Sequence, residues 1–177
     1  RAGEGAALRR AFGRNKRSIT LDLGKAEGRE LAYRLIEGAD VLVEDTNPGE
    51  ARLLGIDYET LRKLNPMIIQ CSITGYGQQG PNVSVSGHDI NFLGMAGAVQ
   101  VLGQCTPEIS SVLADCAGGA MHALVGVLAA LLAREKTGRG QHVDIAVIDT
   151  VLSLMTRFLS GYLDTGEVMS EVHRQIV

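Results

Sequence analysis

Segments with the pattern of a β-strand alternate with segments of helical pattern along most of this chain. Residues 18–23 alternate polar and apolar side chains with a period of two, which predicts a half-buried strand. Residues 27–37 place Leu31, Leu35 and Ile36 at helical spacing. Strands are also predicted at 41–43 (covered on both faces), 67–73 and 143–147, and helices at 58–64 and 148–163. This order is typical of βαβ units, so we predict an α/β fold with a mostly parallel sheet and flanking helices.

Two stretches depart from this alternation. Residues 75–106 are rich in glycine, so we expect loops there with one short helix. Loops on a rigid α/β scaffold commonly carry the chemistry of a protein. Residues 117–133 form the longest apolar run, but small side chains dominate it. This composition predicts a buried helix of an α/β core rather than a membrane span.

Charge and cysteine usage exclude several classes of protein. The chain has 17 Lys and Arg against 20 Asp and Glu, a formal charge of -3, which argues against a nucleic-acid partner. Its three cysteines form no C-x-x-C pair, so neither a disulfide framework nor a metal site is predicted. A reducing, cytoplasmic location is the corresponding expectation.

Residues 75–80 match the pattern G-x-G-x-x-G and follow a predicted strand. A dinucleotide-binding motif would next open a helix and place an acidic residue about 20 positions later. Here Pro81 and a polar loop follow, and no Asp or Glu lies near position 100. We therefore interpret the segment as a tight glycine turn that approaches a ligand, and not as an NAD site.

The beginning of the chain is basic. Arg14, Lys16 and Arg17 belong to a stretch, residues 1–17, in which Glu4 is the single acid. Guanidinium and ammonium groups pair well with phosphate oxygens. The pattern leaves two interpretations open, an anion site and a solvated terminus.

Two candidate catalytic side chains are His88, in a Gly-His-Asp sequence, and Asp115, which precedes a segment of small residues. A histidine beside an aspartate is more often a hydrogen-bonded loop residue, and an aspartate before a helix is most often its N-cap. The residues alone leave both alternatives open. His122, inside the apolar run, is expected to be a packed histidine rather than a ligand.

Several blocks of the sequence resemble family III CoA-transferases, the group that includes carnitine and bile-acid CoA-transferases. The matching blocks follow one another in order, at residues 15–23, 39–44, 48–49, 54–58, 71–81 and 137–144. The chain departs from the family at Thr46 and Asn47, where members commonly carry an aromatic residue and an arginine. The resemblance implies a Rossmann-like α/β fold of the family III CoA-transferase type.

By this resemblance the substrate is an acyl-CoA thioester, with coenzyme A as its carrier and no further cofactor. Lys16, Arg17 and Arg14 are then candidates for binding the phosphates of CoA. The glycine turn and the Gly-His-Asp motif supply the candidates for substrate loops, namely Gly75, Tyr76, Gly77, Asp89 and Asn91.

The resemblance implies two chemistries. In the transferases, an aspartate at the position of Asp115 attacks the acyl-CoA carbonyl and forms covalent intermediates. In the α-methylacyl-CoA racemases, the same aspartate and the Gly-His-Asp histidine, here His88, form the acid/base pair that moves the α-proton. These two residues favour a racemase, whereas residues 161–167 are more similar to transferases. We therefore expect racemisation, with CoA transfer and a non-catalytic CoA-binding fragment as alternatives.

Members of this family are roughly twice as long as the present chain and form interlocked homodimers. The resemblance thus implies that residues 1–177 are a single α/β CoA-binding catalytic core, the incomplete central part of a longer chain. The opening strand-helix unit and the distal small domain of the family would lie outside it. A homodimer is the expected assembly.

Overall fold

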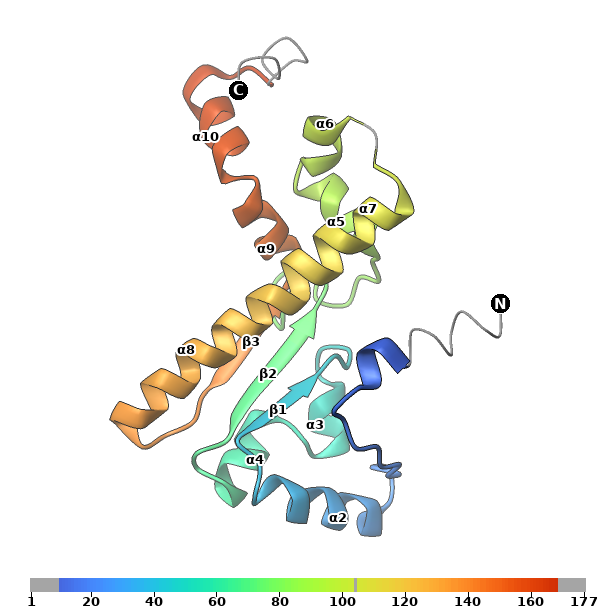
Figure 1. Ribbon diagram of the computed structural model, residues 1–177, viewed down its shortest axis with the longest axis vertical. Coiled ribbons are helices and arrows are strands. Elements are labelled where there is room, and N and C mark those ends of the chain that lie inside the picture. Colours follow the sequence, from blue (N-terminus) through green and yellow to red (C-terminus); the bar gives the residue numbers. More distant parts are fainter. Residues whose placement is uncertain (1–9, 104, 169–177) are drawn as a thin grey trace.

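The computed structural model describes residues 10–103 and 105–168, and within them three strands form one parallel sheet (Figure 1). The strands are β1 (Val41–Glu44), β2 (Ile69–Thr74) and β3 (His142–Ala146), in the order β1-β2-β3. Both neighbouring pairs are parallel, with Cys71 in register with Val43 on one side and Val143 on the other. The predicted α/β class with a parallel sheet is confirmed.

Helices connect and flank these strands. Those before β2 are α2 (Ala26–Ile36), α3 (Glu50–Leu54) and α4 (Tyr58–Leu64). Between β2 and β3 lie α5 (Asp89–Met95), α6 (Ala98–Leu102), α7 (Pro107–Ser111), the π-helical segment η1 (Val112–Met121) and α8 (His122–Thr137). After β3 come α9 (Val147–Leu154) and α10 (Thr156–Thr165). The helices predicted at 27–37 and 58–64 correspond to α2 and α4.

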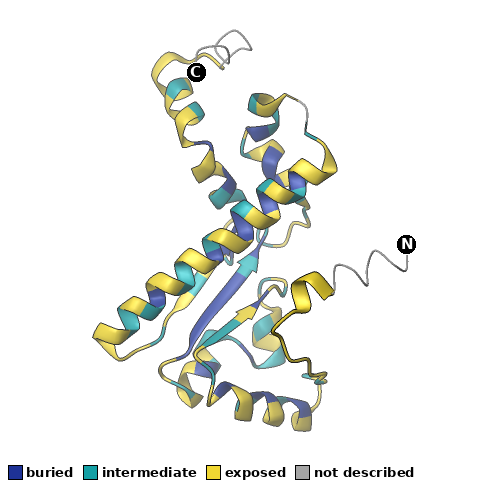
Figure 2. Ribbon diagram, viewed as in Figure 1, coloured by how far each residue is buried: buried dark blue, intermediate teal, exposed yellow. Residues whose placement is uncertain are grey.

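One long helix, Pro107–Thr137, combines α7, η1 and α8 and runs along the sheet (Figure 1). Its small residues permit close approach, since a Cβ added at Gly126 would lie 2.7 Å from Cγ1 of Val143 on β3. Ala123 packs with Cys71 and Ile145 of the sheet. The other side of the helix is exposed (Figure 2) and carries Leu124, Val125, Leu128 and Leu132. The prediction of a buried helix is therefore correct for the face on the sheet and wrong for the opposite face.

By length and composition the same helix could also cross a membrane, which is weak evidence because core helices pass the same test. Two of its small residues, Ala123 and Gly126, lie against the sheet.

Helices α2 and α4 pack beside the beginning of the sheet. Their buried side chains form a cluster with the turn before β2, consisting of Ile36, Ile56, Leu61 and Ile68. The side chain of Asn65 fastens this layer, because its Nδ2 donates to the carbonyl oxygens of Ile36 (3.0 Å) and Ala39 (2.9 Å). Leu42 of β1 packs against this cluster, whereas His142 and Asp144 of β3 are exposed, so these helices cover the sheet only in part.

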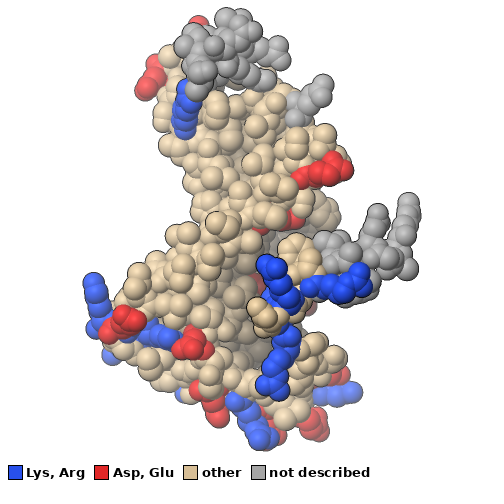
Figure 3. All heavy atoms as spheres, in the orientation of Figure 1, with Lys and Arg blue, Asp and Glu red and all other residues tan. Residues whose placement is uncertain are grey.

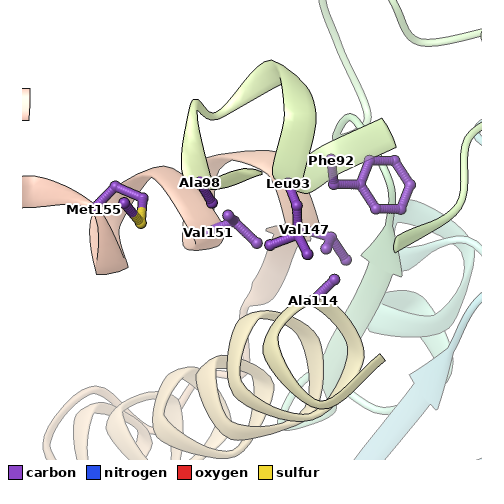
Figure 4. Packing of buried hydrophobic residues seen from close by; sticks show 7 residues of the cluster. All are labelled: Phe92, Leu93, Ala98, Ala114, Val147, Val151 and Met155. Atoms are coloured by element: carbon purple, nitrogen blue, oxygen red, sulfur yellow. The ribbon is translucent and has the colours of Figure 1, made fainter. Parts of the chain in front are cut away.

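A third cluster lies beyond the carboxyl ends of the strands (Figure 4). It joins α5, α6, η1 and α9 through Phe92, Leu93, Ala98, Ala114, Val147, Val151 and Met155. Ala114 points from η1 toward Val147 and Leu93. This cluster positions the segments that form the candidate site.

Four expectations about secondary structure were wrong in detail. Residues 18–23 form no strand, because all of residues 18–20 are exposed and pair with no strand among the described residues. The strand at 41–43 is not covered on both faces, since Val43 is 57% exposed at the edge of the sheet. Residues 75–106 contain two short helices, α5 and α6, instead of one.

The fourth concerns residues 148–163, where the predicted single helix breaks at Met155 into α9 and α10. Two side-chain hydroxyls compete for backbone carbonyls at the break: Ser153 donates to the carbonyl of Thr150 and Thr156 donates to that of Ser153. Such bonds bend helices. Met155 is buried in the cluster beyond the strands, which holds the bend in place.

Candidate active site

A cavity of about 780 Å³ opens where the carboxyl ends of the parallel strands meet. Residues 45–48 follow β1, residues 73–76 end and follow β2, and Val147 follows β3. Ligands of open α/β sheets bind at this edge. The remaining wall consists of one loop and two helices, and its residues are Val83, Ser84, Val85, Ser86, Gly87, His88, Asp89, Phe92 and Asp115.

Asp115 lies within the long helix, on the widened turns of η1. The alternative interpretation of Asp115 as the N-cap of a helix is wrong, because the helix already begins at Pro107. Ser111, one turn earlier, donates its hydroxyl to Oδ2 of Asp115 at 3.1 Å. The side chain is exposed and lines the cavity, so its carboxylate is open to a ligand.

His88 and Asp89 reach the cavity from the start of α5. His88 has extended backbone before the helix, and its N–H donates to Oδ1 of Asn91 at 2.9 Å. The N–H of Asn91 in turn donates to the carbonyl of His88 at 2.8 Å. Asn91 therefore fixes the end of the loop that presents His88, but it does not itself line the cavity.

The glycine turn packs closely on α5. A Cβ at Gly75 would lie 2.5 Å from Cζ of Phe92, and one at Gly87 would lie 2.8 Å from Cε1 of the same ring. The ring of Tyr76 meets Phe92 edge-on, with 5.1 Å between centroids. These contacts explain two of the glycines by steric need. No helix opens within residues 81–88, in agreement with the exclusion of a dinucleotide motif.

Three side chains act on the ionisation of Asp115. Partial burial raises the pKa of the Asp115 carboxyl above its usual range, while the hydrogen bond from Ser111 lowers it. The neighbouring Asp89 raises this pKa by its charge and by a side-chain hydrogen bond, and His88 lowers it. A carboxylate with a raised pKa is a more basic, and hence stronger, nucleophile than an ordinary one.

Removal of the Ser111 hydroxyl tests this arrangement. We expect Ser111→Ala to raise the pKa of Asp115 further, because the bond it removes stabilises the ionised form. Since an attacking carboxylate must be ionised, the acidic limb of the pH profile of kcat/KM moves to higher pH. In Ser111→Ala, kcat/KM should therefore fall severalfold in mild acid and change little in alkali. An unchanged acidic limb would contradict the role of Ser111; Ser153→Ala, on α9, is the matched control.

The structure brings together some of the predicted site residues and not others. His88, Asp89, Asp115, Gly75 and Tyr76 line one cavity. Gly77 does not line it; its φ of +85° and its N–H bond to Oγ1 of Thr74 (3.0 Å) shape the turn behind the wall.

Arg14, Lys16 and Arg17 are exposed and are not among the lining residues. Figure 3 shows several Lys and Arg side chains beside a hollow of the molecular surface. Their binding to phosphates stays a prediction.

Sequence reasoning missed two parts of the site. Asp45, Thr46 and Asn47 line the cavity directly after β1, and the rule that ligands bind at strand carboxyl ends could have identified them. Ser111 was missed because the helix was predicted to begin at residue 117. The spacing of four residues between Ser111 and Asp115 could have identified it, since such residues are neighbours on a helix.

Comparisons with known proteins agree with one another. The family model "CoA-transferase family III" matches residues 1–177. The chain is 37% identical over 164 residues to a succinate--glutarate CoA-transferase of Agrobacterium fabrum, covering 91% of the chain and 41% of that protein. It is 40% identical over 142 residues to a formyl-CoA:oxalate CoA-transferase of Escherichia coli, covering 79% and 34%.

A solved structure gives the same result for the fold. A CAIB/BAIF family protein from Brucella suis superposes with a TM-score of 0.81 at 36% identity, over 88% of this chain and 42% of that one. The chain thus spans well under half the length of these similar proteins.

Proposed function

Since this chain belongs to CoA-transferase family III, we propose that it is the core of an enzyme that moves CoA from an acyl-CoA to a carboxylic acid, with Asp115 as the nucleophile. The observation that carries the proposal is the accessible Asp115 carboxylate on the wall of a cavity at the carboxyl ends of the strands. The relatives named as CoA-transferases support transfer as the reaction.

The proposed reaction splits one difficult exchange into several acyl transfers. A carboxylate oxygen of Asp115 attacks the thioester carbonyl, the C–S bond breaks, and CoA leaves as a thiolate. The acyl group remains on Asp115 as a mixed anhydride. The thiolate then attacks the aspartyl carbonyl and releases the donor acid, leaving an aspartyl-CoA thioester. The acceptor carboxylate attacks this thioester and displaces CoA again. Attack by CoA on the acceptor's acyl carbon yields the new acyl-CoA and frees Asp115.

The other residues would serve this exchange in distinct ways. His88 helps to keep Asp115 ionised, since its charge lowers the pKa of that carboxyl, while Asp89 opposes it. Gly75 and Tyr76 form the wall that the acyl group meets. Lys16, Arg17 and Arg14 would bind the phosphates of CoA. The homodimer remains a prediction from the family resemblance, and the cytoplasmic location remains a prediction from the cysteine usage.

Racemisation is the second candidate, because His88 and Asp115 line the same cavity. An acid/base pair on two walls could remove the α-proton of an acyl-CoA and return a proton to the opposite face. In this reaction His88 is indispensable, whereas in CoA transfer it is auxiliary.

One experiment on the full-length protein separates the candidates. A 2-methylacyl-CoA is incubated in D₂O, α-deuterium incorporation is followed by NMR, and CoA transfer to a free acid is followed in parallel. We expect transfer, a hydroxylamine-trappable adduct on Asp115, and loss of only part of the activity in His88→Ala. Deuterium exchange that vanishes in His88→Ala, without transfer, would overturn the proposal in favour of racemisation. Bound CoA with neither activity would favour a non-catalytic protein.

A further inference from the structure

The π-helical segment that carries Asp115 is an unusual backbone conformation. Its residues, 112–121, form wider turns than the α-helical segments before and after it. Such turns are rare and occur frequently at functional sites. Unfavourable backbone conformations persist only where surrounding contacts hold them. The contacts that hold this segment therefore bear on where Asp115 points.

Close packing holds one side of the segment. A Cβ at Gly118 would lie 3.1 Å from Oγ1 of Thr150 and 3.2 Å from Cγ2 of Val151, so the segment lies directly against α9. Ala114, which precedes Asp115, is fully buried in the cluster of Figure 4. These contacts bring the two helices together, but small side chains alone do not select a π turn over an α turn.

His122, the first residue after the segment, makes a specific bond to it. Its ring Nδ1 lies 2.7 Å from the carbonyl oxygen of Ala117, two residues after Asp115. A carbonyl only accepts hydrogen bonds, so Nδ1 carries the proton and donates. The backbone N–H of His122 bonds to the carbonyl of Gly119 instead. The histidine side chain thus engages a carbonyl on the turn that carries Asp115.

The opposite edge of the same ring reaches α9. Nε2 of His122 lies 3.3 Å from Oγ of Ser153, and that hydroxyl donates to the carbonyl of Thr150 at 2.7 Å. The half-buried ring therefore links the turn after Asp115 to the helix that follows β3.

We propose that His122 is a positioning residue for Asp115: its Nδ1–H, bonded to the Ala117 carbonyl, holds the widened turn in the register that directs the Asp115 carboxylate into the cavity. This rests on the proposed function of Asp115 as the nucleophile. A π turn contains about one residue more than an α turn, and one residue of an α-helix corresponds to about 100° of rotation. Collapse of the turn would consequently turn Asp115 away from Asp89 and from the cavity.

Two conservative variants test the proposal in the full-length enzyme. His122→Asn keeps a donor near the position of Nδ1, whereas His122→Gln places its amide near the position of Nε2 and loses the bond to Ala117. We expect the Gln variant to lose about 10- to 100-fold in kcat with little change in KM, and the Asn variant to stay within about threefold of wild type. A loss of helix stability would give the opposite order of the two variants, because Gln is the better helix former and its variant would be the less affected. Equal kcat values for both variants would overturn the proposal.

Ser153→Ala is the matched control, since it removes the contact of Nε2 and leaves the bond to Ala117 intact. We expect kcat within about threefold of wild type for this variant. A loss as large as that of His122→Gln would assign the effect to the packing of α9 and would overturn the proposal.

A second measurement keeps this inference separate from the proposed reaction. The carboxyl of Asp115 is titrated by ¹³C NMR, with its signal assigned by its loss in Asp115→Asn. In His122→Gln the pKa should return toward the ordinary aspartate value as the side chain leaves its site, and in His122→Asn it should not. This readout needs no turnover. An unchanged pKa in the Gln variant would overturn the positioning role even if transfer is confirmed, and the expected change would support it even if transfer fails.

Discussion

Asp115→Asn should lower the rate of CoA transfer by about 10⁴-fold or more, with the fold unchanged. The amide has nearly the shape of the carboxylate, and its oxygen can still accept the hydrogen bond from Ser111. It lacks the negative charge and cannot form the anhydride with the acyl group. Because the same interaction is lost in every covalent step, kcat and kcat/KM should fall together. Initial rates of acyl-CoA formation, measured by chromatography, check this.

The control for this variant is Asp149→Asn, an identical substitution at an exposed position in α9. Its rate should stay within about twofold of wild type, as for most surface substitutions. The adduct trapped with hydroxylamine should be absent from Asp115→Asn and present in the control. Transfer at more than a small fraction of the wild-type rate in Asp115→Asn would mean that another group is the nucleophile.

Gly140→Ala should have the largest effect on stability, about 3 kcal/mol or more. A Cβ at Gly140 would overlap the carbonyl oxygen of Ile68, a backbone atom that cannot move aside as a side chain does. Gly140 cannot retreat either, since its N–H donates to the carbonyl of Pro66 (2.9 Å) and its carbonyl accepts from the Tyr58 hydroxyl (2.8 Å). The methyl group therefore separates the beginnings of β2 and β3. Urea unfolding followed by circular dichroism measures the loss.

Gly161→Ala is the control, and its expected effect on the free energy of unfolding has the opposite sign. Gly161 lies within α10 and has nothing within 4 Å of an added Cβ. Alanine is the better helix former, so this variant should gain about 0.5–1 kcal/mol. Equal effects of the two substitutions would show that overlap with Ile68 does not control the stability of this region.

Local periodicity predicted the parts of the fold that depend on local sequence. Helices α2 and α4 and strand β2 were found because their apolar positions repeat at a fixed period and glycine or proline ends them. Residues 18–23 have an equally regular pattern and form no strand, because a strand also needs a neighbour with which to pair. The bend at Met155 depends on two hydroxyl groups and a distant cluster, which no window of sequence contains.

The residues of the candidate site were less predictable from local sequence than the helices and strands were. Sequence spacing alone left His88 and Asp115 ambiguous, and only the family resemblance identified them as a pair. Their meeting in one cavity depends on how α5 packs on the long helix, through Phe92 and Ala114. Ser111 was not identified as a neighbour of Asp115 because it precedes the helix predicted from residue 117. His122 lies inside that helix, but its bond to Ala117 depends on π turns that the apolar pattern does not reveal.

The pairing of β2 with β3 also determines when the site can form during synthesis. Gln70 pairs with His142, so the sheet closes only after the whole crossover, α5 to α8, has been made. Contacts between residues so distant in sequence form late, because a long loop must first be closed. On the ribosome, β1 and β2 can pair early. The helix that carries Asp115 emerges before β3, although β3 is one of the strands against which this helix packs. Nascent chains that end before β3 should therefore expose an apolar helix that chaperones recognise, and should hold no assembled cavity.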